Sequence, residues 1–346
     1  MAGTFVPSLQ LNDAFYREVV APLVAPYPHA AALLGWGSDV LGYDTERSTD
    51  HGWGPRLQLF VDKDDVDTVR RQVDTGLPES FRGWPVWYGW DNAEVAHRVD
   101  VLPLGDWLVG QLGVDPRPDL DPLDWLAIPQ QQLLGVVKGA VYADPAGELA
   151  AVRKALDWYP HDVWLWLLGA QWQRISQEEA FVGRTSEVGD ELGSRLVAGR
   201  LARELMGLAF LLERQYQPYT KWFGTAFNQL ASAAEPRPML ERAVAATDFA
   251  TREGALAAAY EALARQHNQA ALTPALDPTV RLFHDRPFRV LDAGRFARAC
   301  VDAIADPALR ELPLVGSVDQ FVDSTDVLSA AGRARQLRAF YDRVGS

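Results

Sequence analysis

The sequence predicts an α+β protein in which a mixed sheet with helices, residues 1–118, is followed by an all-helical domain, residues 119–346. The chain has 346 residues, which is enough for about two domains of ordinary size. Before residue 118, apolar and polar residues alternate in several short segments, as they do in strands. Beyond residue 119, apolar residues recur at spacings of three and four, as they do along one face of a helix.

Composition narrows the classes of function. Hydrophobic residues make up 48% of the chain and charged residues 23%, which is ordinary for a folded globular protein. The formal charge of -13 disfavours duplex nucleic acid as a partner. No stretch approaches the roughly 18 apolar residues that cross a bilayer, and Cys300 has no second cysteine to pair with. Because Met1–Gln10 lacks the pattern of a secretion signal, we expect a cytoplasmic protein with no membrane partner.

The N-terminal part begins with a predicted helix over Leu11–Val24, which Pro26 ends. A short apolar run, Ala30–Leu34, stops at Gly35. In Arg56–Val61, aliphatic residues at 57, 59 and 61 alternate with polar residues at 56 and 58, which predicts a strand covered mainly on one side. The remaining elements predicted here are a helix over 64–74 and strands over 85–88 and 97–102.

The C-terminal part is predicted to be a set of helices punctuated by prolines. The predicted helices cover 162–180, 192–215, 239–266 and 294–305. The clearest apolar stripe runs from Leu192 through Leu196, Leu201 and Leu205 to Leu212, and we expect it to face the core.

Residues 35–56 form the segment richest in functional residue types. Gly37 lets a phosphate approach the backbone, Ser38 offers a hydroxyl, and free N–H groups at a helix start attract an anion. Carboxylates that follow, such as Asp50, are ligands of the kind that Mg²⁺ prefers. The segment therefore favours a metal-dependent nucleotide site, with a plain turn capped by Asp50 as the alternative.

Several segments across nearly the whole chain carry a family resemblance: GSDVLGYDTERSTDH (37–51), WGPR (53–56), GR (183–184), GDELGS (189–194), PYTKW (218–222) and GSVDQ (316–320). They resemble a bacterial family catalogued as a domain of unknown function with a DNA polymerase beta-like nucleotidyltransferase N-terminal part. The helical part resembles the second domain of aminoglycoside nucleotidyltransferases such as the kanamycin enzyme. The resemblance implies a nucleotidyltransferase fold and a C-terminal domain that clamps substrate or nucleotide.

By this resemblance, Gly37 and Ser38 contact the nucleotide triphosphate and Asp50 is the first metal-binding carboxylate. The second acid of the Asp-x-Asp pair is expected at position 52, where this chain has Gly52. A glycine supplies no ligand, which weakens a shared metal site. Three explanations stay open: Asp39 or Asp44 substitutes for the missing acid, the protein binds nucleotide without catalysis, or the change inactivates it.

Further site residues are expected from later segments. Asp100 is the candidate third carboxylate, as a metal ligand or as the acceptor of the attacking hydroxyl's proton; its alternative is an ion pair with an arginine such as Arg98. Lys221 is expected on a phosphate, or else as a surface lysine beside Trp222. The other candidates are Arg184 as a phosphate contact and Asp190 or Glu191 as a general base, with helix capping as the alternative for both acids.

The expected function is Mg²⁺-dependent transfer of a nucleoside monophosphate, with ATP as cosubstrate, to a hydroxyl of a small-molecule acceptor. The acidic, tryptophan-rich composition suits a cationic or sugar-bearing acceptor. A noncatalytic nucleotide sensor or interaction protein is the second hypothesis, and Gly52 is its main support. A carbohydrate hydrolase with paired carboxylates ranks last, because it leaves Gly37, Ser38 and Lys221 without a role.

Overall fold

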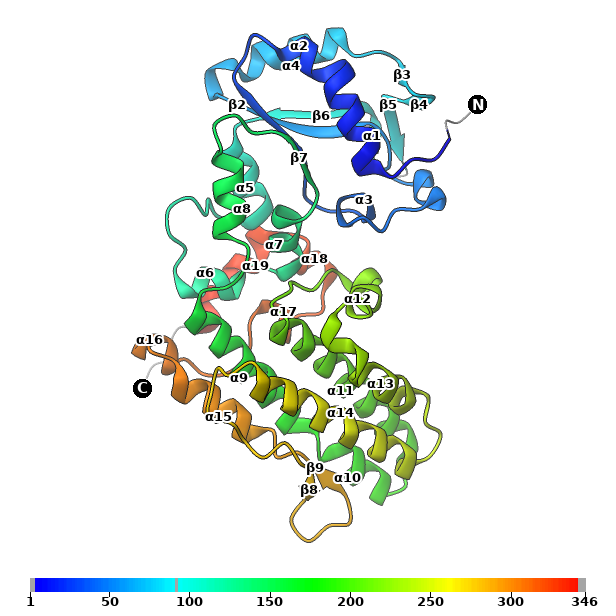
Figure 1. Ribbon diagram of the computed structural model, residues 1–346, viewed down its shortest axis with the longest axis vertical. Helices are drawn as coiled ribbons and strands as arrows, with labels where there is room; N and C mark the ends of the chain where they lie inside the picture. The colour runs from blue at the N-terminus through cyan, green and yellow to red at the C-terminus, as the bar shows by residue number, and fades with distance from the viewer. Residues whose placement is uncertain (1–3, 91–92, 342–346) are drawn as a thin grey trace. The chain divides into compact units, whose positions relative to one another are not determined.

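A computed structural model describes residues 4–90 and 93–341, and the chain separates into two compact units (Figure 1). Unit 1 comprises residues 1–120, 131–157 and 325–335. Unit 2 comprises residues 121–130, 158–324 and 336–346. The expected α+β class is confirmed, because unit 1 contains a mixed sheet and unit 2 is built largely from helices. No helix of the described ranges is both long enough and apolar enough to cross a membrane.

The sheet of unit 1 has the strand order β5-β6-β2-β1-β7. Strands β2 and β6 run parallel, whereas the other neighbouring pairs are antiparallel. The strands are β1 His29–Leu33, β2 Arg56–Val61, β5 Trp87–Trp90, β6 Ala93–Leu102 and β7 Ala140–Ala143. A separate pair, β3 Ser80–Phe81 and β4 Trp84–Pro85, precedes β5.

The two faces of this sheet differ in polarity. Leu57 lies beside Val99 and Leu59 beside Val101, and all four are buried in one apolar core under the first helices, as Figure 1 shows for α1, α2 and α4. The alternate positions place Arg56 beside Arg98 and Gln58 beside Asp100 on the opposite face. The helices against the apolar face are α1 Ser8–Phe15, which continues through a π-helical turn Tyr16–Val20 into α2 Ala21–Val24, and α4 Val66–Gly76.

Residues 131–157 and 325–335 join unit 1, which differs from the expected division at residue 118. The reason is strand pairing, since β7 adds to the edge of the sheet beside β1. The Gly35 N–H also donates to the Gly135 carbonyl, over 2.9 Å. The remaining helices of unit 1 are α3 Ser38–Leu41, α5 Leu104–Leu112, α7 Gln130–Val137, α8 Glu148–Ala155, α18 Thr325–Leu328, α19 Ala331–Arg335 and the 3-10 turns Glu46–Asp50 and Lys63–Asp65.

Unit 2 is organised around α9 His161–Glu178, whose side chains are buried on most sides, including Trp166 and Trp172. The Trp172 ring stacks on Phe296, with ring centroids 4.7 Å apart. The other helices are α6 Pro122–Ala127, α10 Phe181–Glu187, α11 Glu191–Leu212, α12 Thr220–Phe227, α13 Pro236–Ala245, α14 Phe249–Gln269, α15 Gly294–Ala303, α16 Pro307–Arg310, α17 Val318–Phe321 and the 3-10 turns Ala231–Ala234 and Gln336–Tyr341. Against the all-helical expectation, a short hairpin of β8 Arg281–Leu282 and β9 Arg289–Val290 also belongs to this unit.

Two helix predictions need correction. The helix expected over 239–266 is two helices, because Asp248 caps the start of α14 by accepting the Thr251 N–H at 2.8 Å. The stripe on α11 is also not one face: Leu192 and Leu196 are 70% and 66% exposed, whereas Leu201 is buried. Nine residues separate Leu192 from Leu201, which is about two and a half helical turns and places them on opposite sides.

Candidate functional site

The turn after β1 requires glycine at position 37. Gly37 has φ +124° and precedes the short helix α3. A Cβ at this position would lie 2.2 Å from an Asp39 carboxylate oxygen and 3.2 Å from the Arg56 guanidinium. The bare backbone of Gly37 therefore lies directly against an acidic and a basic side chain, with Ser38 next to it in the chain.

Asp39 and Arg56 form a buried ion pair. Arg56 Nε donates to Asp39 Oδ2 over 2.7 Å, and the two side chains are 12% and 6% exposed. The same guanidinium donates to the Trp36 carbonyl at 3.0 Å and lies 5.5 Å from the centre of the exposed Trp36 ring. The negative charge of Asp39 is therefore already balanced by an arginine that is fixed on several sides.

Asp100 lies near this pair on the polar face of the sheet. Although the Asp100 side chain reaches solvent, the surrounding protein displaces part of its hydration and raises its pKa above the ordinary value, while the positive charges of Arg56, His97 and Arg98 act against that rise. Burial also raises the pKa of Tyr88, whose hydroxyl is buried without a hydrogen-bond partner among the described residues and senses the charges of Arg56 and Asp39. We call Asp39, Arg56, Tyr88, Arg98 and Asp100 the Arg56 cluster.

The aromatic residues of β5 border the Arg56 cluster. The Arg98 guanidinium lies 4.5 Å from the centre of the Trp90 ring and donates to the Tyr88 carbonyl over 3.1 Å. Sequence reasoning assigned no site role to Tyr88. The available signal was alternation, because positions 56 and 58 of β2 and positions 98 and 100 of β6 share one face.

Asp50 and Gly52 lie before the strand, not on it. Asp50 ends the exposed 3-10 turn Glu46–Asp50, and β2 begins only at Arg56. Gly52 has φ +63°, and a Cβ there would lie 3.8 Å from the Trp90 ring. The even positions at the start of β2 therefore carry Arg56 and Gln58, and the Gln58 side chain accepts the Leu34 N–H at 3.0 Å.

The carboxylates of unit 1 that were predicted to bind Mg²⁺ do not gather into one cluster among the described residues. Asp39 is paired with Arg56, and Asp44 accepts hydrogen bonds from the Ser8 N–H at 2.7 Å and from Trp53 Nε1 at 2.9 Å. Over residues 4–90 and 93–341, no group of three or more His, Cys, Asp or Glu side chains is placed to hold a metal ion. Metal binding by Asp50, Asp100 and Asp39 stays a prediction.

In unit 2, the two predicted acids at the start of α11 have local partners. Asp190 accepts the Gly193 N–H at 2.8 Å, which is the geometry of a helix cap. Glu191 pairs with Arg195 at 3.0 Å and with Arg252, which is fully buried and also donates to the Ser194 hydroxyl at 2.8 Å. The charge of Glu191 therefore compensates a buried cation.

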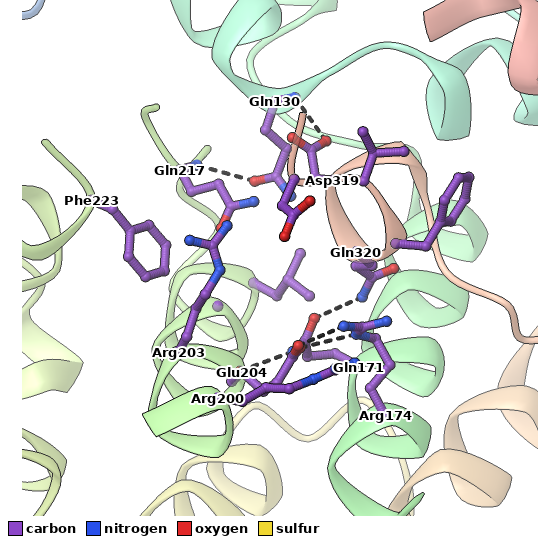
Figure 2. A pocket seen from close by; sticks show the side chains of 15 residues that line it. Gln130, Gln171, Arg174, Arg200, Arg203, Glu204, Gln217, Phe223, Asp319 and Gln320 are labelled. Carbon is purple, nitrogen blue, oxygen red and sulfur yellow. Dashed lines mark hydrogen bonds and ion pairs between the residues drawn. The ribbon is translucent and has the colours of Figure 1, made fainter. Parts of the chain in front are cut away.

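The two predicted phosphate contacts of unit 2 are exposed and lie over aromatic rings. The Arg184 guanidinium is 5.7 Å from the centre of the Phe181 ring, and Lys221 Nζ is 5.0 Å from that of the Trp222 ring. Neither residue lines the pocket of unit 2 that Figure 2 shows. Their roles at a nucleotide stay predictions.

That pocket was missed by sequence reasoning, although one of its residues lies in a quoted motif. Asp319, from the segment GSVDQ (316–320), lines a cavity of about 420 Å³ together with Arg174, Arg200 and Arg203 (Figure 2). Burial raises the pKa of Asp319 to about 7, against the positive charge of Arg203 and hydrogen bonds from Gln130 and Gln217. The motif was visible in the sequence, but its neighbours come from distant segments.

Comparisons with known proteins add a family and one solved structure. Residues 125–223 match the model of a family described as a domain of unknown function (DUF4037). The chain is similar to a nucleotidyltransferase-like protein from Exiguobacterium sibiricum 255-15, with 12% identity, coverage of 85% of this chain and 89% of that chain, and a TM-score of 0.35. No curated protein matches the chain. Function is therefore inferred from the site itself.

Proposed function

We propose that the chain is a nucleotidyltransferase that moves a nucleoside monophosphate, AMP from ATP, to a hydroxyl of a small-molecule acceptor and releases pyrophosphate. The supporting observation is the placement of Gly37 directly against Asp39 and Arg56 of the Arg56 cluster. This arrangement combines a glycine turn, two guanidinium groups and a carboxyl group with a raised pKa on the polar face of the mixed sheet.

Each part has a role in the proposed reaction. Backbone N–H groups of the turn at Gly37 bind the triphosphate in this proposal, and Arg56 and Arg98 offset its negative charge. The acceptor hydroxyl oxygen attacks the α-phosphorus, the bond from that phosphorus to the bridging oxygen breaks, and pyrophosphate leaves. Asp100 takes the hydroxyl proton, for which its raised pKa makes it a better base than an ordinary aspartate. No step is assigned to Mg²⁺, because the described residues gather no group of three side chains that could hold a metal ion.

Nucleotide binding without transfer is the second candidate function. Arg56 balances Asp39 and also lies close enough to influence Asp100, so part of its charge is already used within the cluster. Gly52 lies in a turn with positive φ, where it supplies no ligand. A protein with this arrangement holds a triphosphate through cations and backbone alone and senses its presence.

A thermal-unfolding panel with each nucleoside triphosphate, with and without Mg²⁺, tests the binding step. A ligand at 100 times its Kd adds about 2.7 kcal/mol to folded-state stability. We expect one triphosphate to raise the unfolding temperature of the wild type and to have little effect on Gly37→Ala. Gly110→Ala, a change with no atom within 4 Å of the new Cβ, is the matched control and keeps the response. No response to any triphosphate contradicts both candidate functions.

Pyrophosphate release, measured with pools of hydroxyl-bearing acceptors, separates the two functions. Asp100→Asn removes the proposed base, so it should retain the thermal response and lose pyrophosphate release. A wild type that binds triphosphate and releases no pyrophosphate with any pool supports the sensor instead.

A further inference from the structure

The pocket of unit 2 has the size and lining of a small-molecule site. Its volume of about 420 Å³ lies in the range of roughly 300–1,000 Å³ found for ligand pockets. All of its lining residues belong to unit 2, and they come from α9, α11, α12, α17 and the segments at Gln130 and Gln217. The lining is unusually rich in side-chain amides and guanidinium groups, and Figure 2 shows them converging on one space.

One wall of the pocket is fixed by its own hydrogen bonds. Arg174 pairs with Glu204 at 2.6 Å, and Gln171 Nε2 donates to the same carboxylate over 2.6 Å. Gln320 Nε2 in turn donates to Gln171 Oε1 over 2.8 Å. Arg200, which precedes Glu204 on α11, pairs with Glu178 at 3.1 Å. Two of the three arginines are therefore already neutralised, and the wall is a rigid polar surface.

Arg203 differs from the other two arginines. Its side chain is exposed, and within residues 4–90 and 93–341 no carboxylate lies within ion-pair distance of its guanidinium. The guanidinium lies 5.3 Å from the centre of the Phe223 ring, and Figure 2 shows it pointing along that ring toward Gln217 and the cavity. An aromatic ring thus orients a cation that has an open hydrogen-bonding edge.

Asp319 supplies the complementary group. Its carboxyl accepts the Gln130 N–H at 2.9 Å, and Gln217 contacts it through its side chain. Among the described residues, Tyr159, Tyr341 and Arg203 interact electrostatically with it, and Asp323 lines the same cavity. Because burial raises its pKa to about 7, this carboxyl occurs in both protonation states near neutral pH. The ionised form accepts a hydrogen bond from a hydroxyl, and the protonated form donates one to it.

We propose that this pocket binds a small polyhydroxylated compound with one anionic group, of the class of sugar phosphates and sugar acids. The anionic group of the ligand pairs with the Arg203 guanidinium, and a hydrophobic face of the ligand lies near Phe223. The ligand's hydroxyl groups form hydrogen bonds with the glutamine amides and with Asp319. The preferred charge is opposite to that of the cationic acceptor that composition favoured. The proposal concerns binding alone, so it stands whether or not nucleotide transfer occurs in unit 1.

Calorimetric titration of the full chain, without nucleotide, tests this with four probes: glucose 6-phosphate, glucuronate, glucose and glucosamine. We expect at least one of the two anionic probes to bind, and glucose and glucosamine to bind at least about tenfold more weakly, the scale of one lost charge-assisted hydrogen bond. Comparison of glucose 6-phosphate with glucuronate identifies phosphate or carboxylate as the preferred anion. Failure of both anionic probes to bind, or tighter binding of glucosamine, overturns the proposal.

Two variants assign the anion to its residue. Arg203→Gln should weaken the anionic probe about tenfold to hundredfold and leave glucose unchanged. Arg237→Gln, on α13 and outside the pocket lining, is the matched control, because its exposed cation is already paired with Glu241, and it should change binding by less than about threefold. Equal losses in the two variants overturn the assignment. Both side chains are exposed, so both variants are expected to fold.

Discussion

The Arg56 cluster and the pocket of unit 2 both bring arginines and carboxyl groups together, but they use them differently. Arg56 is buried and paired with Asp39 at 2.7 Å. Arg203 is exposed, oriented by Phe223, and has no ion-pair partner in the described part of the chain. A ligand that binds Arg56 competes with Asp39 for its guanidinium group. A ligand that binds Arg203 displaces no ion-pair partner of the described residues. Burial and pairing, not the presence of arginine, separate the two sites.

The largest difference is expected in stability. Arg56→Ala leaves Asp39 buried without its counter-ion, which costs about 3–5 kcal/mol. Arg203→Ala removes an exposed side chain and is expected within about 0.5 kcal/mol of wild type. Denaturant unfolding of both variants checks this, and equal losses would remove the distinction between the two arginines.

Backbone strain at position 37 of unit 1 gives the next largest effect. Gly37→Ala forces a side chain onto φ +124° and against Asp39, which costs about 1–3 kcal/mol. Gly110→Ala, in the interior of α5, is expected to be more stable than wild type by about 0.5–1 kcal/mol. If Gly37→Ala unfolds like wild type, the turn is not constrained as described.

The next test uses pH and addresses unit 2. The folded-state pKa of Asp319 is about 7, above its unfolded value, so the folded state holds the proton more tightly. The free energy of unfolding therefore falls as pH rises from the unfolded-state pKa of Asp319 toward 7. Above pH 7 this group lowers it no further. Glu179 contributes in the same sense, because burial raises its pKa to about 7 as well. His267 acts at the acidic end, since its pKa of about 4 means that protonation on acidification destabilises the fold.

Asp319→Asn isolates the first of these groups. The variant should gain stability relative to wild type between pH 5 and pH 8, because only the wild type acquires a buried charge over that interval. Unfolding temperatures of both proteins across the range provide the measurement. A stability difference that does not change with pH would show that Asp319 is ionised throughout.

Local sequence patterns were sufficient for much of the fold. The alternation in residues 56–61 and 97–102 predicted β2 and the end of β6, and the spacing of apolar residues predicted α9 and α15. Both patterns indicate which side of an element is buried, and the order of apolar and polar residues within the element is enough to show it. The apolar stripe predicted on α11 was wrong, because spacings of four residues did not reveal that Leu192 and Leu201 lie on opposite sides of the helix.

The candidate sites depend on longer-range contacts that no local pattern contains. The pairing of Asp39 with Arg56 joins residues on either side of a long loop, and the contact of Gln130 with Asp319 spans 189 positions. Asp100 was identified from its place in a strand, but its companions Arg56 and Tyr88 follow only from strand order. Sequence reasoning therefore missed the site residues that distant segments of the chain supply.

The most direct test of the account is a crossed binding experiment. Wild type, Gly37→Ala and Arg203→Gln are each titrated with ATP and, separately, with the anionic sugar probe that the wild type binds. The account predicts that Gly37→Ala weakens only ATP binding and that Arg203→Gln weakens only the sugar probe. Loss of both ligands in either folded variant, or loss of the opposite ligand, would contradict the assignment of two separate sites.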